Sequence, residues 1–126
     1  MQSMPDTVYI GTYTKDDSQA EHRAQGIFAC RVSADGQLSL LSAAVCGPNP
    51  SFLARHPSLP VLYCVNETVD GGVSAFAVDP QTGGLNLLNR QPTGGADPCH
   101  LSLDPSGSWL MASETLPRSS SASRRS

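Results

Sequence analysis

The fold is decided by the stretch Asn49-Pro50-Ser51-Phe52-Leu53-Ala54-Arg55-His56-Pro57-Ser58, because the chain carries a second copy of it. The second copy is Asp97-Pro98-Cys99-His100-Leu101-Ser102-Leu103-Asp104-Pro105-Ser106. Five identical residues recur at an offset of 48: Pro50 and Pro98, Leu53 and Leu101, Pro57 and Pro105, Ser58 and Ser106, Leu62 and Leu110. A repeat of about 40–50 residues built from short strands is typical of the blades of a β-propeller.

Short strands bounded by turn residues fill the rest of the chain. Segments rich in β-branched, aromatic and aliphatic residues predict strands at 8–14, 26–32, 38–42, 51–55, 61–66, 72–78, 85–88, the second-copy counterpart of 51–55, and 109–112. Asp35-Gly36 predicts a hairpin turn, since this pair readily takes positive φ. No window keeps the 3.6-residue spacing of an amphipathic helix for long. The sequence therefore predicts an all-β protein.

The repeats define the expected domain. Units of about 26–66 and 72–112 each hold four predicted strands, and 8–14 adds an extra strand similar to that at 62–66. A single meander sheet cannot bury both of its faces, whereas sheets stacked around an axis can. We therefore predict a partial β-propeller over residues 1–112, with about two four-stranded blades plus an extra strand.

Residues 113–126 differ from the rest in composition. Ser119 to Ser126 contains only Ser, Ala and Arg, which predicts a disordered or aberrant Ser/Arg-rich tail; a basic tail that contacts an acidic partner is the alternative. Closed propellers have at least about four blades, whereas this sequence holds only two repeat units. We therefore expect an N-terminal fragment, truncated or frame-shifted after about residue 112, that is inactive alone.

Composition narrows the partners and the compartment. A net charge of −3 argues against nucleic acid and anionic membrane surfaces. The sequence shows neither a signal-peptide pattern nor an apolar run of about 18–20 residues. Cys30, Cys46, Cys64 and Cys99 form no C-x-x-C pair and lack metal-ligand spacing. We expect reduced thiols packed as small hydrophobic groups in a cytoplasmic protein, with a disulfide or metal role as the alternative.

Five stretches in matching order resemble a known family. They are 8–14, 49–53, 62–67, 71–76 and 97–101. Together they are similar to the cytosolic lactonase family, which includes the seven-bladed propeller type of 6-phosphogluconolactonase and carboxy-muconate-lactonising enzymes. The resemblance implies a seven-bladed ring and a small-molecule sugar lactone substrate. It implies hydrolysis of 6-phosphoglucono-1,5-lactone to 6-phosphogluconate in the pentose phosphate pathway, without metal or redox cofactor.

Two other functions remain open on this fold. They are a carboxy-muconate-type lactonising or cyclising enzyme and a non-catalytic propeller that binds partners, because a fold does not fix a reaction. The family's chain continues for several blades beyond this one, so the resemblance places the phosphate-binding residues outside this sequence. The sequence gives no indication of oligomeric state.

Two residues are candidates for catalysis. His100 occupies the repeat position of Phe52, and an imidazole in place of an apolar ring suits a general base for water. The alternative is a histidine held by a loop carbonyl. Glu67 ends a strand before the polar loop 68–72 and could orient a histidine or bind sugar hydroxyls; the alternative is a solvated loop acid.

Other polar residues have structural interpretations. We expect Asn66 to cap its strand through an Asx-turn. His56 and Asp104 occupy the same position of the two copies, each directly before a Pro, which favours a turn-capping role for both. Arg55 and Arg90 follow strand patterns that predict solvent-facing positions.

Overall fold

The computed structural model describes residues 6–14, 26–114 and 121–124, and every regular element in these ranges is an antiparallel β-strand. The strands are β1 (Asp6–Ile10), β2 (Ile27–Val32), β3 (Leu38–Ala44), β4 (Leu53–Arg55), β5 (Val61–Asn66), β6 (Gly72–Val78), β7 (Leu85–Pro92), β8 (Pro98–Leu103), β9 (Trp109–Glu114) and β10 (Ser121–Arg124). The predicted all-β class is confirmed.

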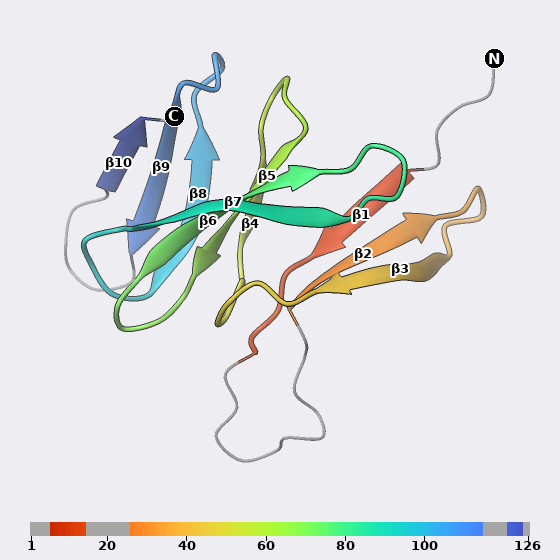
Figure 1. Ribbon diagram of the computed structural model, residues 1–126, viewed down its shortest axis with the longest axis horizontal. Helices are drawn as coiled ribbons and strands as arrows, with labels where there is room; N and C mark the ends of the chain where they lie inside the picture. Colours follow the sequence, from red (N-terminus) through yellow and green to blue (C-terminus); the bar gives the residue numbers. More distant parts are fainter. Residues whose placement is uncertain (1–5, 15–25, 115–120, 125–126) are drawn as a thin grey trace.

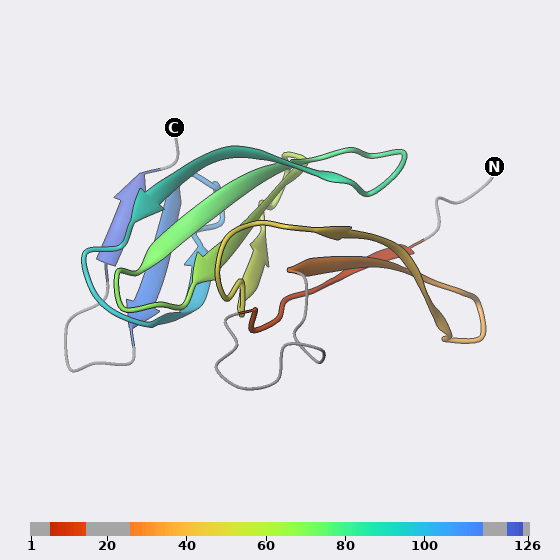
Figure 2. The ribbon, with the colours of Figure 1, turned by 60° about the horizontal axis from the view of Figure 1, so that its bottom comes forward.

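The strands form three sheets. The first is β1-β2-β3, the central one is β4-β5-β6-β7, and the third is β8-β9-β10. Figures 1 and 2 show the four-stranded sheet between the two three-stranded sheets. A strand forms in each of the nine predicted segments, but the one predicted at 8–14 ends at Ile10 and the one predicted at 51–55 begins at Leu53. The strands are grouped as one complete four-stranded sheet with a partial sheet on each side.

The sequence repeat is out of phase with the sheets. Unit 26–66 contributes β2 and β3 to the first sheet and β4 and β5 to the central sheet. Unit 72–112 likewise divides between the central and third sheets. The chain therefore crosses from sheet to sheet at the start of each quoted copy, near Asn49-Pro50 and Asp97-Pro98.

The domain boundary expected at residue 112 falls inside strand β9. β9 continues to Glu114, and Ser121–Arg124 pairs with β9 as β10, with Ser121 opposite Ala112. Pairing uses backbone N–H and C=O groups, which a Ser/Arg-rich segment carries as well as any other. This part of the predicted disordered tail is therefore a strand; residues 115–120 and 125–126 lie outside the described residues.

β5 is buried on both faces and joins two cores. Leu62 and Cys64 face the first sheet, in a cluster with Ile27, Cys46, Phe76 and Val78. Tyr63 and Val65 face the third sheet, in a cluster with Ala75, Leu101, Leu110 and Ala112. Successive side chains of a strand point to opposite faces, so a continuous apolar run supplies both cores.

Side chains cap the turns at one end of the sheets. His56 Nδ1 accepts hydrogen bonds from the backbone N–H of Ser58 (3.1 Å) and Leu59 (2.9 Å). Nε2 must then carry the proton, which it donates to Gly107 O across 3.2 Å. At the equivalent position, Asp104 accepts from Trp109 N at 2.8 Å. The predicted turn-capping roles are confirmed, and bonds from the Ser106 hydroxyl and Trp109 N–H lower the pKa of Asp104.

Candidate functional site

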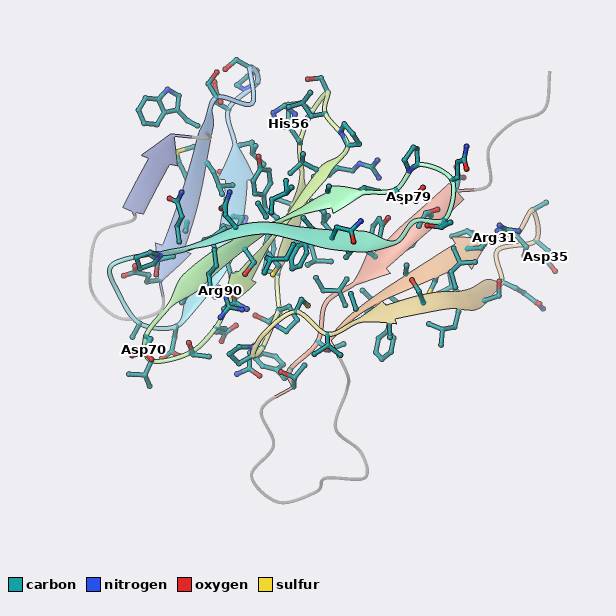
Figure 3. The ribbon with its side chains drawn as sticks, in the orientation of Figure 1. Arg31, Asp35, His56, Asp70, Asp79 and Arg90 are labelled. Carbon is teal, nitrogen blue, oxygen red and sulfur yellow. The ribbon has the colours of Figure 1, made fainter. Side chains whose placement is uncertain are left out.

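The loops 45–52 and 93–97, which cross between sheets, lie at the opposite end from the His56 turn, together with segments 11–14 and 66–72. We call this part of the molecule the crossing end. Figure 3 shows Asp70 and Arg90 at the crossing end and His56 at the other. Tight approach fixes one loop: Thr12 N donates to Pro50 O at 3.0 Å, and a Cβ on Gly11 would lie 2.4 Å from that oxygen.

The carboxylate of Glu67 lies among side chains from two other loops. Tyr13 Oη donates to Glu67 Oε1 at 3.0 Å, and Ser51 Oγ donates to the same oxygen at 2.6 Å. Within the described ranges, Oε2 takes part in no hydrogen bond. Glu67 is half-buried and Tyr13 is 61% exposed, so the carboxylate lies at the surface of the crossing end. The arrangement holds one carboxylate oxygen and leaves the other available to a ligand.

Asn49 positions the backbone around this carboxylate. Its amide Nδ2 donates to Glu67 O at 3.0 Å, and Glu67 N donates to Asn49 O at 3.0 Å. Asn49 also exchanges two hydrogen bonds with Thr14: Thr14 N donates to Asn49 Oδ1, and Asn49 N donates to Thr14 Oγ1, both at 2.9 Å. Asn49 has φ +48°, a left-handed conformation that Asn and Asp tolerate better than most residues, and Asp97 repeats it at +52°.

Tyr13 acts as a stable donor to Glu67. Its hydrogen bond to Glu67 is the main reason that the pKa of Tyr13 rises above its ordinary value; partial burial and the negative charge of Glu67 add to the effect. The phenol therefore stays protonated at neutral pH. A carboxylate that accepts from two hydroxyl groups is oriented as well as solvated, which suits a group that binds or activates a substrate.

His100 lies apart from this hydrogen-bond network. Its exposed ring packs on Phe52 with ring centroids 4.6 Å apart and an interplanar angle of 45°. The two residues hold the same position in the two copies, so repeat equivalents contact each other across adjacent sheets. Within the described residues, no hydrogen bond joins His100 to Glu67. The structure thus places each predicted site residue but does not pair them.

The sequence analysis missed Tyr13, Ser51 and Asn49. Tyr13 and Ser51 reach Glu67 from 54 and 16 residues away in the chain. Only Asn49 carried a sequence signal, since it begins the first copy as Asp97 begins the second.

Asn66 has a different structural role from the one predicted. Its Nδ2 donates to Pro48 O at 2.9 Å, in the β3–β4 connection, and its Oδ1 accepts from Ser74 Oγ at 2.7 Å. Arg90 Nε donates to Ser74 Oγ at 3.1 Å, and its Nη2 donates to Cys46 O at 3.3 Å. Asn66 therefore fastens a crossing loop to the sheet instead of closing an Asx-turn. Arg90 is exposed as predicted, yet its guanidinium is held.

An open hollow lies beside Arg90 and Asn66. Its volume is about 360 Å³, within the range of small-molecule sites. Its lining is Pro48, Asn66, Thr68, Asp70, Gly71, Gly72, Arg90, Gln91 and Pro92. Thr68 follows Glu67 directly, so the hollow and the Glu67 carboxylate share the loop 66–72.

Within the described residues, no three His, Cys, Asp or Glu side chains are grouped as a metal site would require. None of the described segments is a helix long and apolar enough to cross a bilayer.

Comparison with known proteins identifies relatives of this chain. A family model described as Lactonase, 7-bladed beta-propeller, matches residues 7–114. A 6-phosphogluconolactonase of Bacillus subtilis (strain 168) is 31% identical over 105 residues, which are 82% of this chain and 28% of the relative. A 6-phosphogluconolactonase of Formosa agariphila is 38% identical over 81 residues, 62% of this chain and 23% of the relative.

Solved structures give the same result. The crystal structure of a putative 6-phosphogluconolactonase from Bacteroides uniformis matches with a TM-score of 0.71 and 35% identity, covering 84% of this chain and 29% of that one. A second, from Bacteroides fragilis, matches with a TM-score of 0.68 and 35% identity, covering 84% and 31%. The chain thus spans less than a third of the length of these relatives.

Proposed function

The chain belongs to the lactonase family of seven-bladed β-propellers, and from this premise we propose that it forms part of a ring that hydrolyses 6-phosphoglucono-1,5-lactone to 6-phosphogluconate. Two relatives that carry the name 6-phosphogluconolactonase, at 31% and 38% identity, support this reaction. The chain contributes one complete sheet and two partial sheets. We also propose a cytoplasmic location, supported by four free thiols.

The observation that supports the proposal most is the carboxylate of Glu67, in which Tyr13 and Ser51 bond one oxygen and no described residue bonds the other. Hydrolysis of a lactone requires water to add to the ring carbonyl, the bond from that carbon to the ring oxygen to break, and a proton to reach the leaving oxygen. Glu67 Oε2 has no hydrogen bond within the described residues and can accept one from the attacking water or a sugar hydroxyl. Tyr13 and Ser51 hold Oε1 and so fix the direction of Oε2.

His100 is proposed as a second contributor. Its ring is exposed and rests on Phe52, which follows Ser51 in the chain. The ring nitrogen of a neutral imidazole can take up the proton of the attacking water. His100→Gln keeps a polar side chain but removes this proton exchange, so a rate unchanged by that substitution would assign the ring a packing role.

The test transplants this chain into a relative. Residues 7–114 replace the corresponding segment of the Bacillus subtilis 6-phosphogluconolactonase, and acid release from 6-phosphoglucono-1,5-lactone is followed against the spontaneous rate. We expect the chimera to hydrolyse the lactone and the Glu67→Gln chimera to lose about a hundredfold or more in kcat/KM. Unphosphorylated glucono-1,5-lactone measures how far the rate depends on the phosphate.

Asp35→Asn is the matched control. It makes the same carboxylate-to-amide change on the β2–β3 turn, away from the crossing end (Figure 3). A Glu67→Gln chimera that folds and retains the kcat/KM of the Asp35→Asn chimera would contradict the role of Glu67. A folded chimera without lactonase activity would contradict the proposed reaction for this chain.

A further inference from the structure

The hollow at the crossing end contains a guanidinium that only neutral groups hold. Arg90 lies near the end of β7, and Figure 3 shows it at the crossing end with Asp70. Its Nε donates to the hydroxyl of Ser74 at 3.1 Å, and its Nη2 donates to the carbonyl of Cys46 at 3.3 Å. Among the described residues, Arg90 forms no ion pair with a carboxylate. Its positive charge is therefore available to a ligand.

The guanidinium of Arg90 lies directly over Gly47, in the connection from β3 to β4. A Cβ built on Gly47 would lie 2.8 Å from Arg90 Cζ, so a larger residue would displace the guanidinium. Gly47 has φ +82°, a left-handed conformation that glycine adopts without steric cost. Two hydrogen bonds and this contact hold the guanidinium in place before a ligand arrives, which reduces the entropy lost on binding.

Two lining residues bring unused hydrogen-bond donors to the hollow. A guanidinium has five N–H groups, and Nε and Nη2 of Arg90 use one each, which leaves three without a partner among the described residues. The Thr68 hydroxyl accepts from Gly71 N at 3.3 Å and donates no hydrogen bond within the described ranges. A fixed cation beside a hydroxyl donor is the combination that binds a phosphate group.

Asp70 adds a carboxylate to the same lining. Its side chain is exposed and forms no ion pair with Arg90. A carboxylate repels a bare anion but accepts hydrogen bonds from hydroxyl groups. The lining therefore favours a ligand that carries an anionic group at one end and hydroxyl groups at the other.

We propose that the hollow binds a sugar phosphate, with the phosphate on Arg90 and Thr68 and the sugar hydroxyl groups on Asp70. The volume of about 360 Å³ admits a molecule of this size. The choice of a sugar phosphate rests on the proposed function, whose substrate has this chemistry. The family resemblance placed the phosphate-binding residues beyond this chain, and Arg90 supplies one within it. The phosphate is that of the lactone or that of a separate sugar phosphate, and the experiment distinguishes the two.

The first part of the experiment measures binding to the 126-residue chain by calorimetry and NMR spectroscopy. The ligands are glucose 6-phosphate, glucose and inorganic phosphate. We expect glucose 6-phosphate to bind about tenfold more tightly than either of the others, because each of these lacks one half of the contacts. It should shift the resonances of Arg90 Nε–H and of Gly71 N–H, which bonds the Thr68 hydroxyl.

Arg90→Gln should weaken the binding of glucose 6-phosphate about tenfold or more. Arg31→Gln is the matched control, since it removes another exposed guanidinium, on β2 and away from the crossing end (Figure 3). Equal affinities of the two variants would overturn the proposal, and so would glucose binding as tightly as glucose 6-phosphate. If Arg90→Gln does not fold, the unmodified chain decides: unshifted Arg90 and Gly71 resonances at millimolar glucose 6-phosphate would also overturn it.

The second part uses the chimera with the Bacillus subtilis relative and identifies the source of the phosphate. If it belongs to the lactone, Arg90→Gln should raise the ratio of KM for 6-phosphoglucono-1,5-lactone to KM for glucono-1,5-lactone about tenfold. If it belongs to a separate sugar phosphate, that ratio stays the same while the binding of glucose 6-phosphate is still lost. A folded chimera without lactonase activity would contradict the proposed function, and the binding measurements on the chain would still test the hollow.

Discussion

Single polar side chains hold the crossing loops to the sheets. Asn66 is 2% exposed, and both ends of its amide are hydrogen-bonded, to Pro48 O and to the Ser74 hydroxyl. A buried polar group contributes because its loss leaves partners without hydrogen bonds and without water. The amide of Asn66 therefore matters for stability, although it lies beside a candidate catalytic carboxylate.

Replacement of Asn66 by Ala should destabilise the chain. The change leaves Ser74 Oγ and Pro48 O without this partner, so we expect a loss of about 1–3 kcal/mol in the free energy of unfolding. Urea denaturation followed by circular dichroism measures it. Asn86→Ala, at an exposed position of β7, is the control and should change stability by less than about 0.5 kcal/mol. Equal losses at the two sites would contradict the importance of the Asn66 contacts.

At the same scale, sequence reasoning found Glu67 and His100 as candidates but not their surroundings. Glu67 was recognisable because it ends a strand before a Gly-rich loop. Its partners Tyr13 and Ser51 were not, since contacts between loops far apart in the sequence depend on how adjacent sheets are placed. The exchange of Phe52 for His100 was visible from the repeat, whereas the stacking of these two rings on each other was not.

At the scale of elements, the strands were predictable and their assignment to sheets was not. Each strand carries its own signal in β-branched, aromatic and alternating apolar residues. Sheet membership depends instead on where the chain crosses, which is set by the left-handed Asn49 and Asp97 and the prolines that follow them. A repeat fixes the period of a structure but not the point at which its sheets begin.

The turns at the far end of the sheets form a second connection between elements. His56 of the β4–β5 turn bonds Gly107 O of the β8–β9 turn, and a Cβ on Gly107 would lie 2.3 Å from His56 Nε2. Gly107→Ala should therefore displace the ring and cost about 1–3 kcal/mol beyond backbone strain. Thermal or urea unfolding of the variant measures the loss.

Gly94→Ala separates the two contributions to that loss. Gly94 has φ +84° against +74° at Gly107, so alanine is strained at both sites, but a Cβ on Gly94 meets nothing within 4 Å. We expect Gly94→Ala to show the backbone strain alone, about 1–2 kcal/mol. If the two alanine variants unfold at the same denaturant concentration, the His56 contact contributes nothing to stability.

At the scale of the whole molecule, the central sheet is covered on both faces and the outer sheets on one. Leu110 and Ala112 of β9 face the central sheet, whereas Trp109 and Met111 on its other face are 48% and 43% exposed. On β1, Val8 and Ile10 are 38% and 39% exposed. In a propeller, such faces are where neighbouring blades pack.

The single Trp of the chain reports on this packing. Trp109 fluorescence of the isolated chain should be strongly quenched by acrylamide and should have the red-shifted emission of a hydrated indole. In the chimera with the Bacillus subtilis relative, a following blade should cover β9, shift the emission to the blue and reduce quenching. Unchanged emission and quenching in a folded chimera would contradict this position for Trp109.

The phase difference between repeat and sheet has a consequence for how such a chain can grow or shrink. Each unit begins with the last two strands of one sheet and ends with the first two strands of the next. Duplication or loss of one unit in a gene would therefore rejoin equivalent half-blades, leaving every remaining strand beside a partner of the correct type. The number of blades can therefore change by one in a single genetic event, while the packing between neighbouring blades is preserved.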